Sequence, residues 1–241
     1  MNNGCLGTHY SFISMRTHYQ YIIIGAGCAG LQLADALLKE TSLSVSSMLI
    51  LEANPNHEPK TWCFWEESDH PYRHLVKKTW KKIAFGAPGI AVSGALTELC
   101  YQYISSNDFY SQQLELLQKD GRVDIVYEKA NSLTCNNQIP QVSIDSGIIS
   151  ADTIFYSYPI GETQRTPTLW QHFLGWEIET SEPVFTEDTA TMMDFSLTDK
   201  RDAVFFHYLF PFSSTTALVE CTFFSEALVH TSVYEALLTR Y

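Results

Sequence analysis

The stretch that decides the fold runs from Gln20 to Glu40 and reads QYIIIGAGCAGLQLADALLKE. It opens with a short run of apolar, β-branched residues, Gln20 to Ile24, that is typical of a buried strand. After a break at three glycines, leucines and alanines recur at helical spacing as far as Lys39. A second apolar run, Ser47 to Leu51, predicts the next strand. These segments predict a β-α-β unit with a right-handed crossover, and therefore an α/β fold with a Rossmann-type domain.

The glycines of this stretch form a G-x-G-x-x-G motif at Gly25, Gly27 and Gly30. In such a motif the glycines permit a tight turn, a close approach of the backbone around Ala26 to a diphosphate, and helix–strand packing. Glu52 follows the motif at close to the ~20 residues usual for a carboxylate that binds ribose hydroxyls. The motif predicts FAD or NAD binding, against the alternative of a glycine turn that only packs. The carboxylate argues against the 2′-phosphate of NADPH.

The composition is that of a globular protein, with 241 residues, of which 45% are apolar and 17% charged. This length suits one large domain or two small ones. The net charge of −12 argues against a nucleic-acid binder, because phosphate backbones require a cationic surface. No apolar run approaches the ~18 residues of a spanning helix, but peripheral docking through apolar side chains stays open.

The cysteines and the N-terminus indicate a cytosolic protein. The six cysteines contain no C-x-x-C pair, which argues against a metal site and favours reduced thiols. The segment before the first strand lacks the basic and apolar regions of a signal peptide. We expect residues 1–18 to be disordered or misannotated, with Met15 as an alternative start.

Beyond Glu52 we expect an irregular region from Ala53 to about Lys78, around the aromatic cluster TWCFWEE. Patterning then predicts strands at 80–85, 99–104 and 122–128, a helix at 105–119 and a hairpin at 141–150. Four aromatic-rich runs follow at 171–180, 191–197, 203–209 and 216–224, and a short amphipathic helix ends the chain. We therefore predict a Rossmann-type domain with insertions over 19–158 and an antiparallel substrate sheet over 159–241 that is incomplete at its C-terminal end.

With these motifs in view, the chain resembles the lycopene cyclase family of flavin-dependent carotenoid cyclases, and most of all its bacterial lycopene β-cyclase branch. The resemblance starts in the glycine stretch and continues in KTWCFW at Lys60–Trp65. It extends in order through NDFYSQQL, LWQHFLGWEIET, EPVFTEDTATMMDF and LFPFSSTTALVECTFFS. The resemblance spans roughly Tyr19 to Tyr241. The stretches KTWCFW and LFPFSSTTALVECTFFS are far more specific to the family than the glycine motif is.

The chain also departs from the family pattern. Tyr156-Ser-Tyr-Pro159 stands where the family has an Asp-x-Arg-Pro-like turn, and Ser196 stands where arginine is common. The family continues past this length through a glycine-rich segment with a Pro-Ser-Thr-Gly-Tyr-like motif that helps to hold the flavin. The chain is therefore expected to be a fragment or a truncated gene product.

The resemblance implies an acid-initiated, redox-neutral cyclisation of the linear ends of lycopene to β-ionone rings. It implies FAD in its reduced form, with NAD(P)H as a possible reductant of the flavin. Glu220 in ALVECTFFS matches the glutamate that the family uses as its acid, and its apolar neighbours would keep it protonated. The alternative for Glu220 is a carboxylate on the solvent face of an edge strand. Asp194 is a second candidate, which would orient or partner the acid.

The aromatic cluster suits a carbocation. Trp62, Phe64 and Trp65 could offer ring faces that attract a cation and exclude water, against the alternative of packing under a loop. His172 and His207 are more typical of satisfied strand histidines than of proton carriers. The resemblance implies a linear carotene substrate and a cytoplasmic protein in peripheral contact with the membrane.

Two other functions compete with this hypothesis. One is an FAD-dependent monooxygenase that acts on an apolar substrate and needs no alkene-protonating acid. The other is an inactive cyclase fragment that binds flavin weakly or not at all.

Overall fold

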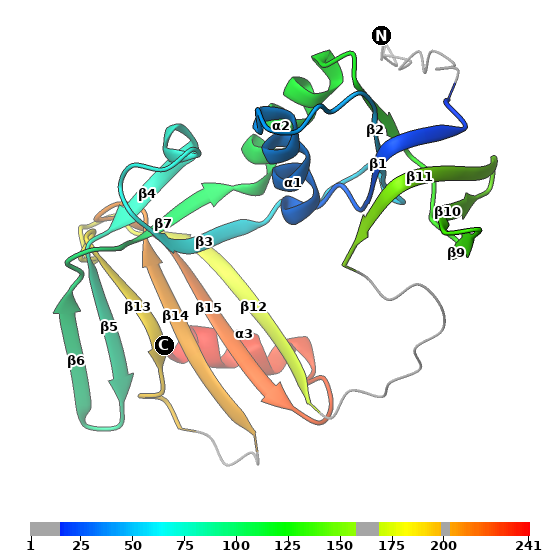
Figure 1. Cartoon of the computed structure of the whole chain (residues 1–241). Coiled ribbons are helices and arrows are strands. Elements are labelled where there is room, and N and C mark those ends of the chain that lie inside the picture. Colours follow the sequence, from blue (N-terminus) through cyan, green and yellow to red (C-terminus); the bar gives the residue numbers. More distant parts are fainter. Residues whose placement is uncertain (1–14, 158–168, 199–202) are drawn as a thin grey trace, which may run out of the picture. The chain divides into compact units, whose positions relative to one another are not determined.

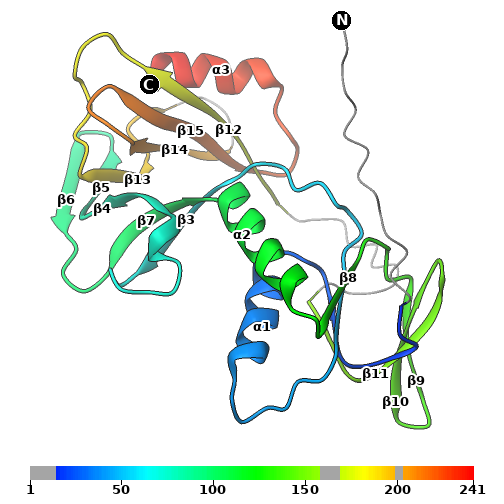
Figure 2. The ribbon, with the colours of Figure 1, turned by 90° about the horizontal axis from the view of Figure 1, so that it is seen from above.

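The structure is a computed structural model that describes residues 15–157, 169–198 and 203–241. The chain divides into two compact units. The first unit comprises residues 1–58 and 110–163, and the second comprises residues 59–109 and 164–241. Figure 1 labels most elements of both units, and Figure 2 also labels β8. We describe the two units separately.

The first unit is built on a six-stranded sheet in the order β8-β2-β1-β11-β10-β9. Its strands are β1 (His18–Ile24), β2 (Met48–Leu51), β8 (Val123–Val126), β9 (Ser132–Asn136), β10 (Ile139–Ile144) and β11 (Gly147–Tyr156). The strands β8, β2, β1 and β11 pair in parallel, while β11, β10 and β9 form an antiparallel meander. The helix α1 (Cys28–Lys39) connects β1 to β2, so the predicted β-α-β unit is confirmed.

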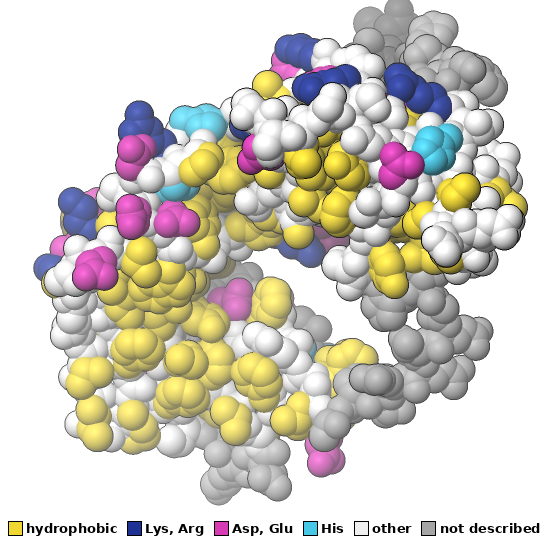
Figure 3. All heavy atoms as spheres, viewed as in Figure 1, with side chains coloured by type: hydrophobic (Ala, Val, Ile, Leu, Met, Phe, Trp, Pro, Cys, Tyr) yellow, Lys and Arg dark blue, Asp and Glu magenta, His cyan; other side chains and the backbone are white. Residues whose placement is uncertain are grey.

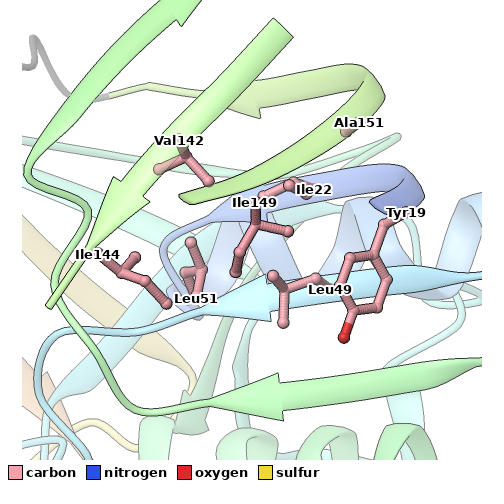
Figure 4. Packing of buried hydrophobic residues seen from close by; sticks show 8 residues of the cluster. All are labelled: Tyr19, Ile22, Leu49, Leu51, Val142, Ile144, Ile149 and Ala151. Atoms are coloured by element: carbon pink, nitrogen blue, oxygen red, sulfur yellow. The ribbon is translucent and has the colours of Figure 1, made fainter. Parts of the chain in front are cut away.

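A compact apolar core lies on this sheet, and Figure 4 shows that its side chains come from four strands. The cluster consists of Tyr19, Ile22, Leu49, Leu51, Val142, Ile144, Ile149 and Ala151. The hydroxyl of Tyr19 is satisfied inside this core, because it donates to Asp124 Oδ2 at 2.7 Å. The core therefore fixes β1 and β2, whose C-terminal ends carry the glycine turn and Glu52.

The second unit contains a six-stranded sheet in the order β12-β15-β14-β13-β5-β6. Its strands are β5 (Lys82–Ala87), β6 (Ile90–Ala95), β12 (Trp170–Glu179), β13 (Thr189–Asp194), β14 (Val204–Pro211) and β15 (Thr216–Ser225). All neighbours pair antiparallel except β13 and β5, which pair in parallel. The predicted antiparallel sheet is thus present, with an added hairpin from earlier in the chain.

A helix covers one face of this sheet. Figures 1 and 2 show α3 (Thr231–Arg240) lying along β12 and β15, where Tyr234, Leu237 and Leu238 are buried. They pack against Phe205 on β14 and against Val219, Cys221 and Phe223 on β15. The residues that alternate with these along β14 and β15 therefore point to the opposite face of the sheet.

A three-stranded sheet, β3-β7-β4, completes the second unit. It consists of β3 (Thr61–Glu66), β4 (Val76–Trp80), β7 (Cys100–Ser105) and the short 3-10 turn η1 (Arg73–Leu75) that precedes β4. The helix α2 (Ser106–Lys119) follows β7 and returns the chain to the first unit. Trp80 is fully buried, and its indole N–H donates to the backbone oxygen of Pro211 at 2.9 Å.

The structure corrects three expectations. The stretch TWCFWE is a strand rather than part of an irregular region, because it pairs with β7 from Thr61 to Glu66. The single strand predicted at 80–85 is two strands in different sheets, since Trp80 pairs with Tyr101 whereas Ile83 pairs with Ala190.

The third correction concerns the units. Residues 59–109 belong with the second unit and not with the Rossmann-type domain, because β5 joins β13 and β4 packs on β14. The predicted boundary near Pro159 and most of the segment 1–18 lie outside the described residues, although β1 already begins at His18.

Candidate functional site

The glycine turn has the geometry that its motif predicts. Gly25 has a φ of 104°, a left-handed value that favours glycine, and its N–H donates to Leu51 O at 2.7 Å. A Cβ at Gly30 would lie 2.0 Å from the carbonyl oxygen of Gly25. Any side chain at Gly30 would therefore push α1 away from the turn.

Glu52 lies against this turn. Its Oε2 atom accepts a hydrogen bond from the N–H of Ala26 at 2.8 Å, and its Oε1 atom accepts one from the N–H of Asn54 at 2.8 Å. The backbone N–H of Glu52 donates to Val126 O on β8, which fixes the end of β2. The structure thus brings together the five predicted cofactor-binding residues.

A cleft of about 460 Å³ opens beside the turn, within the first unit. Its lining includes Gly25, Gly27 and Cys28 on one side and Tyr156 and Ser157 on the other. Gly27 is the N-cap of α1 and supplies no side-chain cap, and the first turn of α1 carries no acidic residue. The helix N-terminus is therefore suited to an anionic group such as a diphosphate.

Sequence reasoning missed an aromatic pair near this cleft. The rings of His57 and Tyr110 stack at 3.8 Å between centroids, with an interplanar angle of 6°. Burial raises the pKa of the Tyr110 hydroxyl, and the nearby Cys28 and Glu52 raise it further. No local pattern could have indicated this pair, because its members lie on segments far apart in the sequence.

The second candidate centre surrounds Glu220 on β15. Glu220 is half-buried, and in the sheet it lies between Tyr208 on β14 and Gly175 on β12. Its Oε1 atom accepts a hydrogen bond from the hydroxyl of Thr222 at 2.8 Å. Burial raises the pKa of the Glu220 carboxyl, and the bond from Thr222 only partly opposes this. Such an acid keeps its proton at a higher pH than an exposed glutamate does.

Two residues from the three-stranded sheet face the same centre. Cys63 and Tyr101 lie close to each other and to Glu220, because each affects the pKa of the other and the Glu220 charge raises the pKa of both. Burial is the largest cause that raises the pKa of Cys63, to about 12. Tyr208, across the strand pair, also has its pKa raised by burial and then by Glu220. Sequence reasoning did not connect Cys63 and Tyr101 with Glu220, because their proximity to it depends on the packing of two sheets.

The predicted cation-stabilising aromatics divide between the two faces of β3. Trp65 shares a face with Cys63 and lies 4.7 Å from Tyr101, centroid to centroid. Trp62 packs edge-on against Phe109 at 5.4 Å, and Phe64 packs against His70 at 5.5 Å. Because successive side chains of a strand alternate, the structure brings only Trp65 of the three to the Tyr101 side.

Asp194 lies on the opposite face of the large sheet from Glu220. It pairs across the ladder with His207, whose ring stacks on Tyr241 at 4.3 Å, and its Oδ2 atom accepts from the Tyr241 hydroxyl at 2.8 Å. Burial raises the pKa of Asp194, but bonds from Ser196 and Tyr241 outweigh it and lower the pKa. The structure therefore does not bring Asp194 and Glu220 together.

The two strand histidines differ. His172 matches the expectation of a satisfied histidine, because its ring nitrogens bond to the hydroxyls of Tyr234 and Ser225. His207 does not match it. It is fully buried, and within the described chain neither of its ring nitrogens has a hydrogen-bond partner. Desolvation lowers the pKa of His207 to about 4, although Asp194 opposes the shift.

The sheet face that carries Glu220 is strongly apolar. Figure 3 shows hydrophobic side chains spread over β5, β6, β13 and β14 of the second unit. Pairing places Phe85 opposite Val92 and Val204 opposite Phe224 on this face. The residues of this apolar sheet face that expose more than a third of their surface are Phe85, Ile90, Val92, Phe173, Phe195 and Val204. Exposed apolar side chains that gather on one face are a common feature of binding surfaces.

Two kinds of feature are absent from the described residues, which are 15–157, 169–198 and 203–241. No helix in these ranges is long and apolar enough to cross a bilayer. No group of three or more His, Cys, Asp or Glu residues in the same ranges is arranged to hold a metal ion.

A family model described as Lycopene cyclase protein matches residues 20–241. The comparison with curated proteins gave no match.

Solved structures share the fold at low sequence identity. Klebsiella pneumoniae HpxO complexed with FAD and uric acid matches with a TM-score of 0.60 and 14% identity, over 92% of this chain and 61% of that one. Halogenase PltM in complex with phloroglucinol and FAD matches with a TM-score of 0.59 and 14% identity, over 92% of this chain and 56% of that one. The 2,6-dihydroxypyridine-3-hydroxylase from Arthrobacter nicotinovorans matches with a TM-score of 0.55 and 11% identity, over 88% of this chain and 57% of that one. These matches confirm the predicted Rossmann-type α/β fold, and the chain spans 56–61% of the length of these three proteins.

Proposed function

The chain belongs to the lycopene cyclase family, since the family model covers residues 20–241, and from this premise we propose that it is a flavin-dependent lycopene β-cyclase. The observation that carries the proposal is the setting of Glu220. This carboxyl is half-buried on an apolar sheet face beside Tyr208 and Tyr101, and burial raises its pKa. A carboxylic acid whose surroundings favour its protonated form suits the protonation of an alkene.

The first unit fits a dinucleotide cofactor. Gly25 to Gly30 and the N-terminus of α1 would hold the diphosphate of FAD, and Glu52 would exchange its bond to Ala26 for the ribose hydroxyls. Bound in its reduced form, the flavin would supply an electron-rich ring that favours positive charge, with no net transfer of electrons. NAD(P)H is the reductant that we propose for it.

Glu220 would begin the reaction by giving its proton to the terminal double bond of a linear carotene. The O–H bond of the acid breaks, a C–H bond forms, and a tertiary carbocation results. A neighbouring double bond then closes a six-membered ring by forming a C–C bond. Loss of one proton sets the ring double bond and restores the proton balance, so product and substrate are isomers.

The aromatic residues near Glu220 would protect this cation. Ring faces attract cations by ~2 kcal/mol or more where water is excluded. We assign this role to Trp65, Tyr101 and Tyr208, and the assignment is supported by the contact of Trp65 with Tyr101 and by the Glu220 charge, which acts on both tyrosines. Their bulk would also keep out water, which would otherwise capture the cation as an alcohol.

The substrate that we propose is lycopene or another linear carotene. The apolar sheet face would receive such a molecule along its length, with Phe85 and Val92 toward one edge and Phe173 toward the other. Because linear carotenes reside in bilayers, we propose that the protein is cytoplasmic and contacts the membrane peripherally.

Expression in a lycopene-accumulating bacterial host, followed by pigment chromatography, tests the proposal. We expect a β-ring product from the parent chain and at least a 100-fold loss of it in Glu220→Gln, because general acid catalysis contributes roughly 10²–10⁴-fold. Glu177→Gln is the matched control, since Glu177 is an exposed acid two residues from Gly175, and it should retain activity. Cyclisation that persists in Glu220→Gln would refute the assigned role.

The fold likeness to a hydroxylase favours one alternative, an FAD-dependent monooxygenase that acts on an apolar substrate. Its product would gain the mass of an oxygen atom, and its activity would survive Glu220→Gln. Unchanged lycopene beside an active family member of full length would indicate instead an inactive cyclase fragment.

A further inference from the structure

The six-stranded sheet of the second unit has two edges of different character. At one edge, β12 carries Glu177 and Glu179, and charged side chains discourage pairing with a further strand. At the other edge, β6 reads IAVSGA and contains neither a charged residue nor a proline. Its pairing with β5 runs without a register shift from Ile90 to Ala95, so no bulge interrupts this part of the described sheet. The edge at β6 therefore lacks the usual devices that prevent strand addition.

The hydrogen bonds of the β5–β6 hairpin show which backbone groups of β6 are available. The N–H of Leu96, the residue after β6, donates to the carbonyl oxygen of Lys81 at 2.8 Å. Because bonding alternates along an antiparallel ladder, the N–H and C=O groups of Ala91, Ser93 and Ala95 point away from β5. Every residue of β6 is exposed. These backbone groups thus form a row to which a partner strand can bond.

The side chains of β6 are complementary to those of a second, antiparallel β6. The longest overlap of bonded pairs forms when Ser93 of one copy lies opposite Ser93 of the other, with Ala91 opposite Ala95. On the other face of the strand, Val92 then lies opposite Gly94 of the second copy. Val92 is 57% exposed, and the Cβ position of Gly94 has no atom within 4 Å. The valine of each copy therefore finds room beside the glycine of the other.

We propose that β6 pairs with β6 of a second copy of this chain, about a two-fold axis at Ser93, and so joins two six-stranded sheets into one. No charged residue lies in the paired strands, which matters because each chain carries a net charge of −12. Residues opposite each other in a ladder point to the same side. The exposed side chains of Ile90 and Val92 from both copies would therefore extend one apolar face. Dimer formation does not depend on the proposed reaction.

Sedimentation velocity of the purified full chain over a range of concentrations tests the proposal. We expect the parent to form a dimer and Ser93→Pro to weaken it roughly tenfold or more, because proline removes an N–H donor from each copy. The hairpin itself should tolerate this proline, since the N–H of Ser93 points away from β5. Ser93→Lys, which opposes two like charges, serves if the proline variant does not fold. Thermal unfolding checks the fold, and Ser93→Ala is the matched control that should dimerise like the parent.

Cysteine cross-linking tests the register of the pair. Ser93→Cys should form an intermolecular disulfide under mild oxidation, because the Cα atoms of a bonded pair lie ~5.5 Å apart, within disulfide range. Ala91→Cys is the control, since the two copies of position 91 would lie about 14 Å apart along the strand. The exposed Cys135 is present in both variants, so its own reactions cancel in the comparison.

The outcomes decide between this contact and others. A parent that stays monomeric, a dimer that persists in the folded Ser93→Pro and Ser93→Lys variants, or a cross-link only in Ala91→Cys overturns the proposal. So do assemblies larger than a dimer, because a two-fold contact closes at two copies. Gln171→Lys adds a charge to β12 at the opposite edge, and a dimer lost in this variant but kept in Ser93→Lys would place the contact there. Dimer loss confined to the proline and lysine variants at position 93, with a cross-link in Ser93→Cys, supports the proposal.

Discussion

At the scale of single residues, two titratable side chains whose pKa values are shifted by burial lie on opposite faces of one sheet. Glu220 is surrounded by aromatic rings, and burial raises its pKa. His207 is buried on the other face between Asp194 and the ring of Tyr241, and desolvation lowers its pKa to about 4. Burial disfavours the charged form in both cases, so the Glu220 carboxyl keeps its proton to a higher pH, and the His207 ring stays neutral to a lower pH, than the same groups would in water. Only Glu220 lies on the face that carries the exposed apolar side chains.

The neutral His207 makes stability depend on pH. Its pKa falls from 6.5 in the unfolded chain to about 4 in the folded one, so the unfolded chain binds the extra proton. Stability is fully present above pH 6.5 and is lost as the pH falls from 6.5 to 4, by roughly 3 kcal/mol. We expect His207→Phe, which keeps a ring against Tyr241, to remove this part of the acid loss.

Urea unfolding of the parent and of His207→Phe at pH 7, 5.5 and 4.5 measures the effect as the difference between the two proteins. This difference cancels the contribution of carboxyls such as Asp120 and Asp188, whose lowered pKa values act in both proteins. Parallel pH dependence of the two proteins would contradict this prediction, because it would show that the pKa of His207 is the same in the folded and the unfolded chain.

At the scale of elements, strand alternation decides which parts of a motif can act together. The aromatic cluster of β3 is continuous in sequence, but its side chains divide between the Phe109 side and the Tyr101 side. The glycine motif behaves differently, because a turn followed by a helix gathers its residues on one cleft. A motif in a turn therefore predicts a site more directly than a motif in a strand does.

The glycine motif allows packing and binding to be separated. Gly30→Ala places a Cβ 2.0 Å from the Gly25 carbonyl oxygen, and such overpacking costs about 1–3 kcal/mol or more. Gly27→Ala meets no atom within 4 Å, so it should fold normally and bind FAD roughly tenfold more weakly, because its methyl group occupies the approach of the diphosphate. Thermal unfolding and FAD fluorescence titration check the pair. A Gly27→Ala variant that is destabilised but binds FAD with unchanged affinity would contradict the binding role of Gly27.

The local signals of the sequence were sufficient for the first unit and insufficient for the second. The segment from Gln20 to Glu52 could be predicted nearly to its strand ends, because its contacts are close in sequence and its glycines have specific backbone roles. The break between β4 and β5 at Lys81 could not be predicted, because it depends on hydrogen bonds from the backbone N–H groups of Lys81 and Lys82 to the carbonyl oxygen of Asp188, far along the chain. Tyr101 and Cys63 near Glu220 were hidden for the same reason.

At the scale of the whole molecule, the chain combines a net charge of −12 with an exposed apolar sheet face in its second unit. An excess of acidic residues repels the anionic lipids that attract many peripheral proteins. Membrane contact by this protein would therefore rest on apolar burial rather than on charge.

This balance predicts how membrane binding responds to lipid charge. We expect more of the protein to sediment with neutral phosphatidylcholine vesicles than with vesicles containing phosphatidylserine. Raising the salt concentration should reduce the difference in binding between the two kinds of vesicle, because screening weakens the repulsion. Co-sedimentation at two salt concentrations measures this. Preference for the anionic vesicles at low salt would show that a local basic surface dominates over the net charge.

The parallel pairing of β5 with β13 also has a consequence for how the chain is made. Ile83 and Ala190 are neighbours in the sheet although roughly a hundred residues separate them. At a synthesis rate of ~5–20 residues per second, β5 leaves the ribosome roughly 5–20 s before its partner. During that interval Phe85, Ile90 and Val92 of the β5–β6 hairpin have no completed sheet beside them. The β5–β13 part of the second unit therefore forms late and through non-local contacts, and until then the β5–β6 hairpin lacks the neighbour strand that completes its sheet.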